Sequence, residues 1–130
     1  MAKLNILFVF IVGCGGFIGS ILRYVLSFCL QNYSKAFPFG TFGSNICGCF
    51  IIGILGEFIT RKNFLSQELW LFFATGLCGG FTTMSSMIYE LTKYLENGKI
   101  INAGVYLFSS LICSFASFYL GNLLARRVFI

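Results

Sequence analysis

The chain has 130 residues, of which 58% are hydrophobic and only 10% are charged. So little polar surface cannot cover a soluble globule of this size, which excludes an ordinary soluble domain and favours a lipid bilayer. The net charge of +5 does not indicate nucleic-acid binding, because the nine basic residues are scattered and form no patch. The six cysteines lie in apolar stretches and there is no histidine, so we expect neither disulfides nor a zinc-type site.

Four hydrophobic stretches, each long enough to cross a bilayer, account for most of the chain. We expect spans at about 4–30, 38–60, 68–95 and 100–125, joined by short loops, so that residues 1–130 form one all-α domain. The first span has no cleavage-site pattern, so we interpret it as a mature helix rather than a signal peptide. The four acidic residues lie near span ends and form no acid–base cluster. We therefore expect a multi-pass protein of the cell inner membrane without enzymatic activity.

The basic residues say little about orientation in the membrane. If the spans alternate in direction, five basic residues fall on one side and three on the other, with Arg23 near the second boundary. The five are Lys3, Arg61, Lys62, Arg126 and Arg127, and the three are Lys35, Lys93 and Lys99. This bias is too small for the positive-inside rule to select one orientation. Two alternatives stay open: insertion both ways with head-to-tail pairing, or one constant orientation.

The third span has an unusual concentration of glycine and threonine. Residues 75–83 read TGLCGGFTT at the centre of an otherwise apolar stretch. A Gly-Gly pair weakens a continuous helix, and unwound backbone at bilayer depth is tolerated only where it faces protein, water or an ion. The pattern predicts a broken third helix, with a merely flexible glycine-rich helix as the alternative. Carbonyls freed at such a break suit a small cation such as sodium.

Polar residues inside the spans are functional candidates, because each needs a hydrogen-bond partner in hydrocarbon. Asn45 lies in the middle of the second span, with Thr41 one turn earlier on the same face. The fourth span has a polar residue at every fourth position: Asn102, Tyr106, Ser110 and Ser114. Uncharged N–H and O–H donors suit the passage of a small anion, because a full positive charge would hold the ion too tightly. The alternative for Asn45 is that its amide only holds two helices together.

Three segments together resemble the Fluc (CrcB) family of fluoride channels. They are residues 15–24 (GGFIGSILRY), 40–45 (GTFGSN) and 76–85 (GLCGGFTTMS), and their order and spacing match across the whole four-span chain. The resemblance implies a dual-topology antiparallel homodimer in the membrane, with two pores that export fluoride passively and relieve its toxicity. It also implies a central structural sodium ion, held by the backbone carbonyls of Gly79 and Thr82 from both subunits.

The resemblance implies roles for individual side chains as well. Asn45 is expected to be the pore amide, and Thr41 is expected in the polar lining. Arg23 is expected near the aqueous vestibule and Glu90 near the opposite end of the pore. The remaining expected pore positions are Met84, Ser85, Ser86, Met87, Tyr106, Ser110 and Ser114.

One segment departs from the family pattern. The family usually has two phenylalanines in a TTFSTF-like run, whose ring edges face the ion, whereas residues 82–87 read TTMSSM here. Aromatic edges are weakly positive, whereas methionine offers a flexible thioether with weakly polarised C–H groups. Met84 and Met87 therefore leave three alternatives: a working pore, a slower or less selective pore, or a chain that needs a partner subunit with phenylalanines. Both methionines could also be plain packing residues.

Two other functions compete with a fluoride channel. Small multidrug exporters also have four helices, but they couple to protons through a buried carboxylate in the first span, and this first span has none. An accessory or assembly subunit would explain the glycine-rich helix faces. It would not explain the predicted break together with Asn45 and the polar stripe of the fourth span.

Overall fold

The computed structural model describes residues 4–62 and 65–129, apart from the side chains of residues 60–62 and 129. All regular structure in these residues is helical. Four helices are long and apolar enough to cross a membrane, namely Ile6–Leu30, Phe39–Ile59, Gln67–Glu96 and Ile100–Val128. The predicted all-α, four-span fold is confirmed, and the expected spans agree with these bounds within a few residues.

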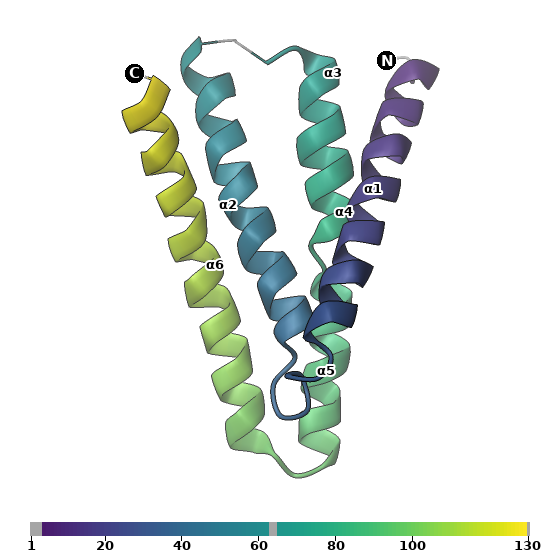
Figure 1. Cartoon of the computed structure of the whole chain (residues 1–130), viewed down its shortest axis with the longest axis vertical. Coiled ribbons are helices and arrows are strands. Elements are labelled where there is room, and N and C mark those ends of the chain that lie inside the picture. The colour runs from purple at the N-terminus through teal and green to yellow at the C-terminus, as the bar shows by residue number, and fades with distance from the viewer. Residues whose placement is uncertain (1–3, 63–64, 130) are drawn as a thin grey trace.

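The first two spans are single helices. α1 (Ile6–Leu30) begins after Asn5, whose side chain accepts a hydrogen bond from the Leu7 amide and so caps the helix. A loop containing the only proline leads to α2 (Phe39–Lys62). Figure 1 shows α1 and α2 as long, nearly straight rods on different sides of the third span.

The third span is assembled from several segments. It begins with α3 (Gln67–Trp70), continues as the π-helical η1 (Leu71–Cys78) and ends its first half with α4 (Gly79–Phe81). After two extended residues, α5 (Met84–Glu96) completes the crossing. Gly98, with a positive φ of 70°, makes the turn that L side chains disfavour and leads into α6 (Ile100–Phe129). Both ends of the chain lie opposite this α5–α6 turn (Figure 1).

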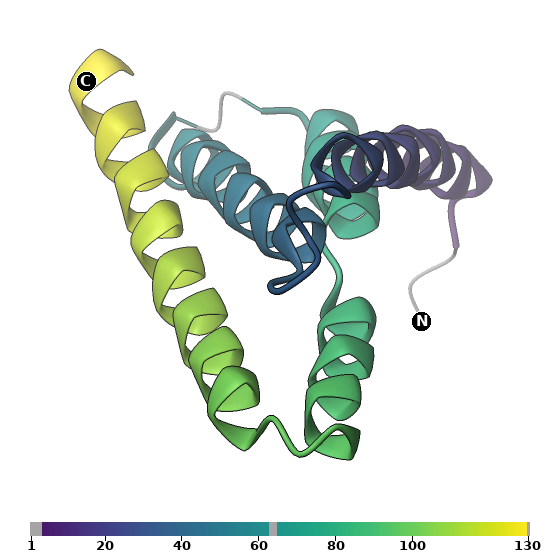
Figure 2. The same ribbon diagram turned by 60° about the horizontal axis from the view of Figure 1, so that its bottom comes forward.

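The break in the third span falls at Thr82 and Thr83, which are extended, with ψ values of 156° and 114°. The prediction of a broken helix is confirmed, but the Gly79-Gly80 pair precedes the break, and Gly79 keeps helical angles of −62° and −38°. The glycines therefore do not unwind the chain themselves. Figure 2 shows the extended connection between the two halves of the span, with α5 leading away from it.

Glycine instead allows α1 to approach the first half of the third span. A Cβ atom at Gly15 or Gly19 would collide with backbone carbonyls of η1, and one at Gly80 would collide with the carbonyl of Gly16. Small residues at a helix interface let backbones come close, which replaces the hydrophobic driving force that is missing in lipid. This seam holds α1 against η1 and α4, so the residue before the break is held in place from one side.

α2 and α6 form a second close seam. A Cβ atom at Gly53 would collide with the carbonyl of Phe118, and one at Gly121 with the carbonyl of Phe50. The Ser117 hydroxyl donates across the seam to the carbonyl of Ile46 at 2.9 Å. The sequence pattern did not indicate the Ser117 bond.

A buried carboxylate joins α2 and α6 near the end of the bundle that carries the termini. Glu57, only 5% exposed, accepts a hydrogen bond from Asn122 Nδ2 at 2.8 Å and pairs with Arg126 Nε at 3.1 Å. A buried carboxylate needs such partners, since an unpaired charge is costly there. Glu57 and Asn122 therefore act as structural residues at this end.

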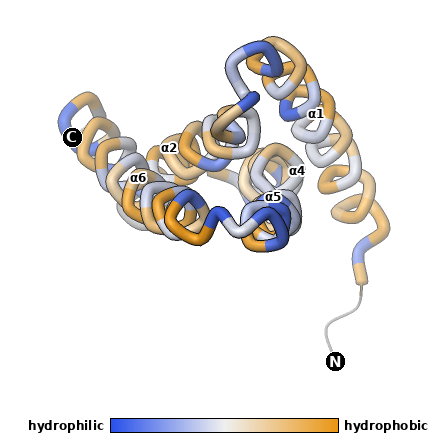
Figure 3. Tube along the Cα trace, turned by 90° about the horizontal axis from the view of Figure 1, so that it is seen from below, coloured by the Kyte–Doolittle hydropathy of each residue, from blue (hydrophilic) through white to orange (hydrophobic). Residues whose placement is uncertain are grey.

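The outer faces of the bundle are apolar. Aromatic side chains such as Phe17, Phe108 and Phe115 are more than 60% exposed in the protomer. Seen from the turn end in Figure 3, hydrophobic residues run along the helices, while hydrophilic residues gather at the end of α5 and the α5–α6 turn. This distribution fits helices whose sides face lipid or another apolar chain, and whose ends face water.

Candidate functional site: a polar path beside the break

The amide of Asn45 is bonded to the backbone of Thr83 in both directions. Asn45 Oδ1 accepts from the Thr83 N–H at 2.7 Å, and Asn45 Nδ2 donates to the Thr83 carbonyl at 3.2 Å. In a continuous helix the Thr83 N–H would instead donate to the carbonyl of Gly79, four residues earlier. The Asn45 side chain of α2 thus replaces the helical hydrogen bond of the Thr83 N–H and stabilises the break from the second span.

Thr83 organises the start of α5, a role that the sequence analysis missed. Its hydroxyl accepts a hydrogen bond from the Ser86 amide at 3.1 Å, which makes Thr83 the N-cap of α5. The same oxygen lies 3.1 Å from the hydroxyls of Ser85 and Ser86. The available signal was a threonine three residues before a serine at the start of an apolar helical run.

Arg23 of α1 reaches both halves of the broken span. Its Nε donates to the carbonyl of Gly80 at 3.2 Å, and its Nη1 lies 3.5 Å from the hydroxyl of Ser86. A guanidinium has several donors in one plane, so the Arg23 side chain can bond both the Gly80 carbonyl of α4 and the Ser86 hydroxyl in the first turn of α5. The structure therefore places Arg23 beside the break.

A groove of about 290 Å³ lies between α2, the break and α6. Asn45, Ser110 and Ser114 all line it, so the structure brings together residues that the sequence analysis expected in one pore. Ser110 is only 3% exposed, and its hydroxyl has no hydrogen-bond partner among the described residues. Asn102, by contrast, is exposed and does not line this groove. The polar stripe of α6 is thus shorter than the spacing of four suggested.

A second group of polar residues lies closer to the α5–α6 turn. The carboxylate of Glu90 accepts the hydroxyl of Thr41 at one oxygen and the hydroxyl of Tyr106 at the other, each at 2.6 Å. Thr41 is 6% exposed and Tyr106 is fully buried. Three helices thus contribute one residue each to a cluster in which the carboxylate is fully engaged by neutral donors.

The two methionines of residues 82–87, the segment that departs from the family pattern, are not equivalent. Met84 is 62% exposed in the protomer, whereas Met87 is 3% exposed. Met87 packs in the core cluster with Leu91, Ala103 and Tyr106. Both line the groove. Met87 also packs in the core, so the size of a side chain at this position is limited by the groove on one side and by the core on the other.

Two backbone carbonyls at the break have left the helical pattern. The Thr83 N–H that would reach the Gly79 carbonyl goes to Asn45, and Gly79 is exposed on the surface of the protomer. Thr82 is extended, which turns its carbonyl out of the helical hydrogen-bonding direction. Carbonyl oxygens of this kind suit a hard cation. Among the described residues, no three side chains of His, Cys, Asp or Glu gather in a way that could hold a metal.

Four apolar spans and a largely apolar groove that contains a few uncharged hydrogen-bond donors define a small multi-pass membrane protein with a broken third helix. Residues 10–122 match the family model described as CrcB-like protein, Camphor Resistance (CrcB). The chain belongs to this family, which confirms the resemblance found in the three sequence segments.

Relatives from several bacteria match almost the whole chain, and each is named fluoride-specific ion channel FluC. The protein of Prosthecochloris aestuarii is 42% identical over 118 residues, which are 91% of this chain and 92% of the relative. That of Chlorobium phaeobacteroides is 40% identical over 116 residues, covering 89% and 91% of the two chains. That of Rhizobium etli is 39% identical over 119 residues, covering 91% and 95%. These names indicate a transport protein rather than an enzyme.

Proposed function

We propose that this protein is a fluoride-specific ion channel that lets fluoride leave the cell passively. The observation that carries the proposal is the Ser110 hydroxyl, which is buried, has no hydrogen-bond partner within the described part of the chain, and lines the groove beside Asn45. A polar group left unpaired in an apolar interior costs free energy unless a ligand or water satisfies it. A small anion that accepts hydrogen bonds would satisfy it. The names of the relatives agree with this assignment.

Asn45 supplies both support and a donor. An amide nitrogen carries two hydrogens, and the Thr83 carbonyl takes one of them. The second hydrogen is left for an ion in the groove, together with the hydroxyls of Ser110 and Ser114. Neutral donors replace the water around fluoride at moderate strength, so the ion can both enter and leave. No chemical conversion is proposed.

The protein is proposed to act as an antiparallel homodimer in the membrane lipid, with two pores related by its two-fold axis. Met84 and Gly79, at the groove and the break, are exposed in a single protomer, so a second protomer could cover them. A two-fold axis would present the same surface from a second copy. A mixed dimer, in which another subunit supplies phenylalanines, is the second candidate, favoured by the methionines at positions 84 and 87.

The carbonyls of Gly79 and Thr82 are proposed to hold the structural sodium ion. One protomer offers two such oxygens, and a two-fold axis would bring four around one cation. When bound, the ion would fasten the two protomers at the break and add a positive charge there. Replacing sodium by the bulky cation N-methylglucamine during purification should then lower fluoride efflux and the stability of the dimer.

The test is fluoride efflux from liposomes that contain only this purified protein, read with a fluoride electrode and repeated with chloride. Rapid efflux that strongly favours fluoride supports the channel and shows that a pore with two methionines works. Absence of efflux from a stable dimer would support an accessory or mixed-dimer role instead. Export of organic cations driven by a proton gradient would support the small multidrug exporter.

A further inference from the structure

A second cavity, of about 240 Å³, opens where the loop after α1 meets the α5–α6 turn. Lys35 from the loop, Lys93 from α5 and Lys99 from the turn line it, together with Glu90. The loop is held against α5 by the Tyr94 hydroxyl, which donates to the carbonyl of Ala36 at 2.6 Å. The lysines therefore surround one built opening rather than lying on unrelated surfaces.

The charges around this cavity do not balance. Lys93 pairs with Glu96 at 2.9 Å, and both side chains are about half exposed. Lys35 and Lys99 are exposed and make no ion pair with any carboxylate among the described residues. Glu96 pairs with Lys93 and Glu90 also lines the cavity, so three lysines and two carboxylates leave a net charge of +1 at the opening.

One residue, Glu90, belongs both to this cavity and to the polar cluster inside the bundle. Glu90 lines the cavity and, with the same carboxylate, binds the hydroxyls of Thr41 and Tyr106. An anion that entered the bundle through this cavity would pass this carboxylate, which has the same sign of charge. Positive side chains at the opening would offset that repulsion.

We propose that Lys35 and Lys99 form an anion-collecting mouth at the Glu90 end of the path, which takes up small monovalent anions from water. The inference rests on the proposed function and adds a capture step to it. Lysines in water act through a long-range field that raises the local concentration of anions without discriminating among them. Selection of fluoride would then take place deeper, at Asn45 and Ser110.

The test compares the parent chain with the double variant Lys35→Gln/Lys99→Gln in vesicles of zwitterionic lipid, whose headgroups bring no net charge. Initial fluoride efflux is measured at low fluoride and at two ionic strengths, set with an impermeant salt. Removing two charges within a Debye length should lower efflux about threefold to fivefold at ~10 mM and leave it nearly unchanged at ~500 mM. Equal efflux of variant and parent at low ionic strength would overturn the proposal.

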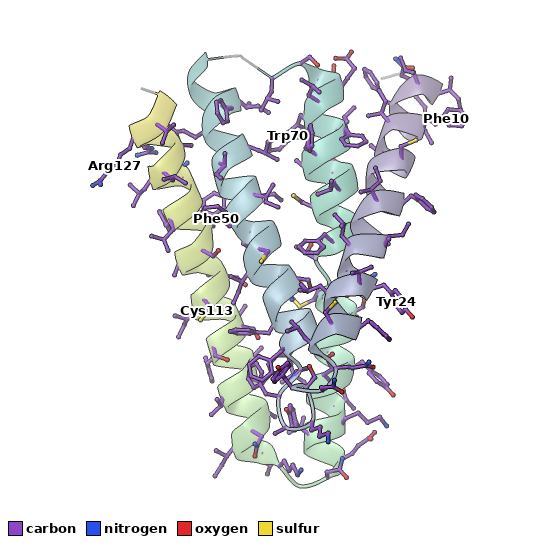
Figure 4. The ribbon with its side chains drawn as sticks, viewed as in Figure 1. Phe10, Tyr24, Phe50, Trp70, Cys113 and Arg127 are labelled. Carbon is purple, nitrogen blue, oxygen red and sulfur yellow. The ribbon has the colours of Figure 1, made fainter. Side chains whose placement is uncertain are left out.

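Two matched variants separate the field from other effects. Lys35→Arg/Lys99→Arg keeps the charges and should keep the parent efflux. Arg127→Gln removes a positive charge at the end of α6, which lies at the opposite end of the same protomer from the α5–α6 turn (Figure 4), and should lower efflux at low ionic strength much less than the glutamine pair does. A drop in Arg127→Gln as large as that in the glutamine pair would contradict a mouth at this cavity.

A measurement that needs no fluoride conduction distinguishes this inference from the proposed function. Ser34 lines the same cavity, so Ser34→Cys places a thiol there. The ratio of its reaction rates with anionic and cationic thiosulfonates reports the local electrostatic potential. The reaction of the parent's own cysteines is measured separately and subtracted. The anionic reagent should be favoured, and Lys35→Gln/Lys99→Gln should lower that preference severalfold. An unchanged preference overturns the mouth even if efflux is normal. A charge-dependent preference in a chain without efflux overturns only the fluoride channel.

Discussion

The side-chain amide of Asn45 and the backbone of Thr83 hold each other through two hydrogen bonds, although the residues are 38 positions apart. One side chain of the second span thus supplies the acceptor that the Thr83 N–H loses where the helix breaks, and adds a donor to the Thr83 carbonyl. The break and the donor beside it are therefore one structural unit, and a substitution at Asn45 affects both.

Asn45→Asp keeps an acceptor for the Thr83 N–H but removes the donor to the Thr83 carbonyl and adds a negative charge to the groove. We expect fluoride efflux to fall at least about tenfold. The ion loses a hydrogen-bond donor, and the new carboxylate repels it. The dimer should still form in detergent. Asn5→Asp is the matched control, since aspartate caps α1 equally well. Efflux from Asn45→Asp at the parent rate would remove Asn45 from the pore.

Ser110 and Ser117 allow a separation of function from stability on one helix. Ser110→Ala removes a hydroxyl that has no hydrogen-bond partner among residues 4–62 and 65–129, so we expect lower fluoride efflux without loss of thermal stability. Ser117→Ala removes the bond to Ile46, so we expect a loss of about 0.5–1.5 kcal/mol with efflux preserved. Efflux rates and unfolding curves in detergent measure the two effects. The reverse pattern would show that the groove is not the path.

Gly19 and Gly13 test the close approach of α1. A Cβ atom at Gly19 would collide with the carbonyl of Leu77, so Gly19→Ala should force the helices apart, at a cost of about 1–3 kcal/mol. Gly13 has nothing within 4 Å of such an atom, and Gly13→Ala should fold like the parent. The yield of folded protein and its thermal stability in detergent are the measurements. Equal destabilisation by both substitutions would argue against this seam.

Restoring phenylalanine should have different effects at the two methionine positions. Met87→Phe places a ring in a filled core with Leu91 and Tyr106, and overpacking should cost about 1–3 kcal/mol. Met84 is 62% exposed in the protomer, so Met84→Phe should not destabilise the protomer. Thermal unfolding of both variants gives the comparison. A Met87→Phe protein as stable as the parent would show that this core adapts readily.

The antiparallel dimer predicts two orientations of one chain in the membrane. A cysteine introduced at Asn97, which lies in the exposed α5–α6 turn, should be labelled from outside in only part of the molecules in intact cells. An impermeant thiol reagent, before and after permeabilisation, measures the two populations, with the unsubstituted chain as the background. A single population, wholly accessible or wholly protected, would contradict dual topology.

Much of the candidate site could be predicted because local chemistry and motif order determine it. Asn45 was singled out as a polar residue in hydrocarbon, and the broken third span as a run of glycine and threonine. The exact position of the break was harder to predict from the sequence. The glycines allow the close contact with α1, whereas the break lies two positions after Gly80, where Asn45 and Arg23 bind the backbone around it. The role of Glu57 also depends on a partner 69 positions away, Arg126, which no local pattern reveals.

The sequence by itself determined the four membrane helices, their approximate bounds and the family, because hydrophobic length and motif spacing are properties of contiguous residues. Only the tertiary structure decided which donors are already satisfied and which are left for an ion. Thr41 and Tyr106 both donate to Glu90, whereas Ser110 has no partner within the described chain. Hydrogen bonding is directional and short in range, so these assignments depend on how three helices approach one another.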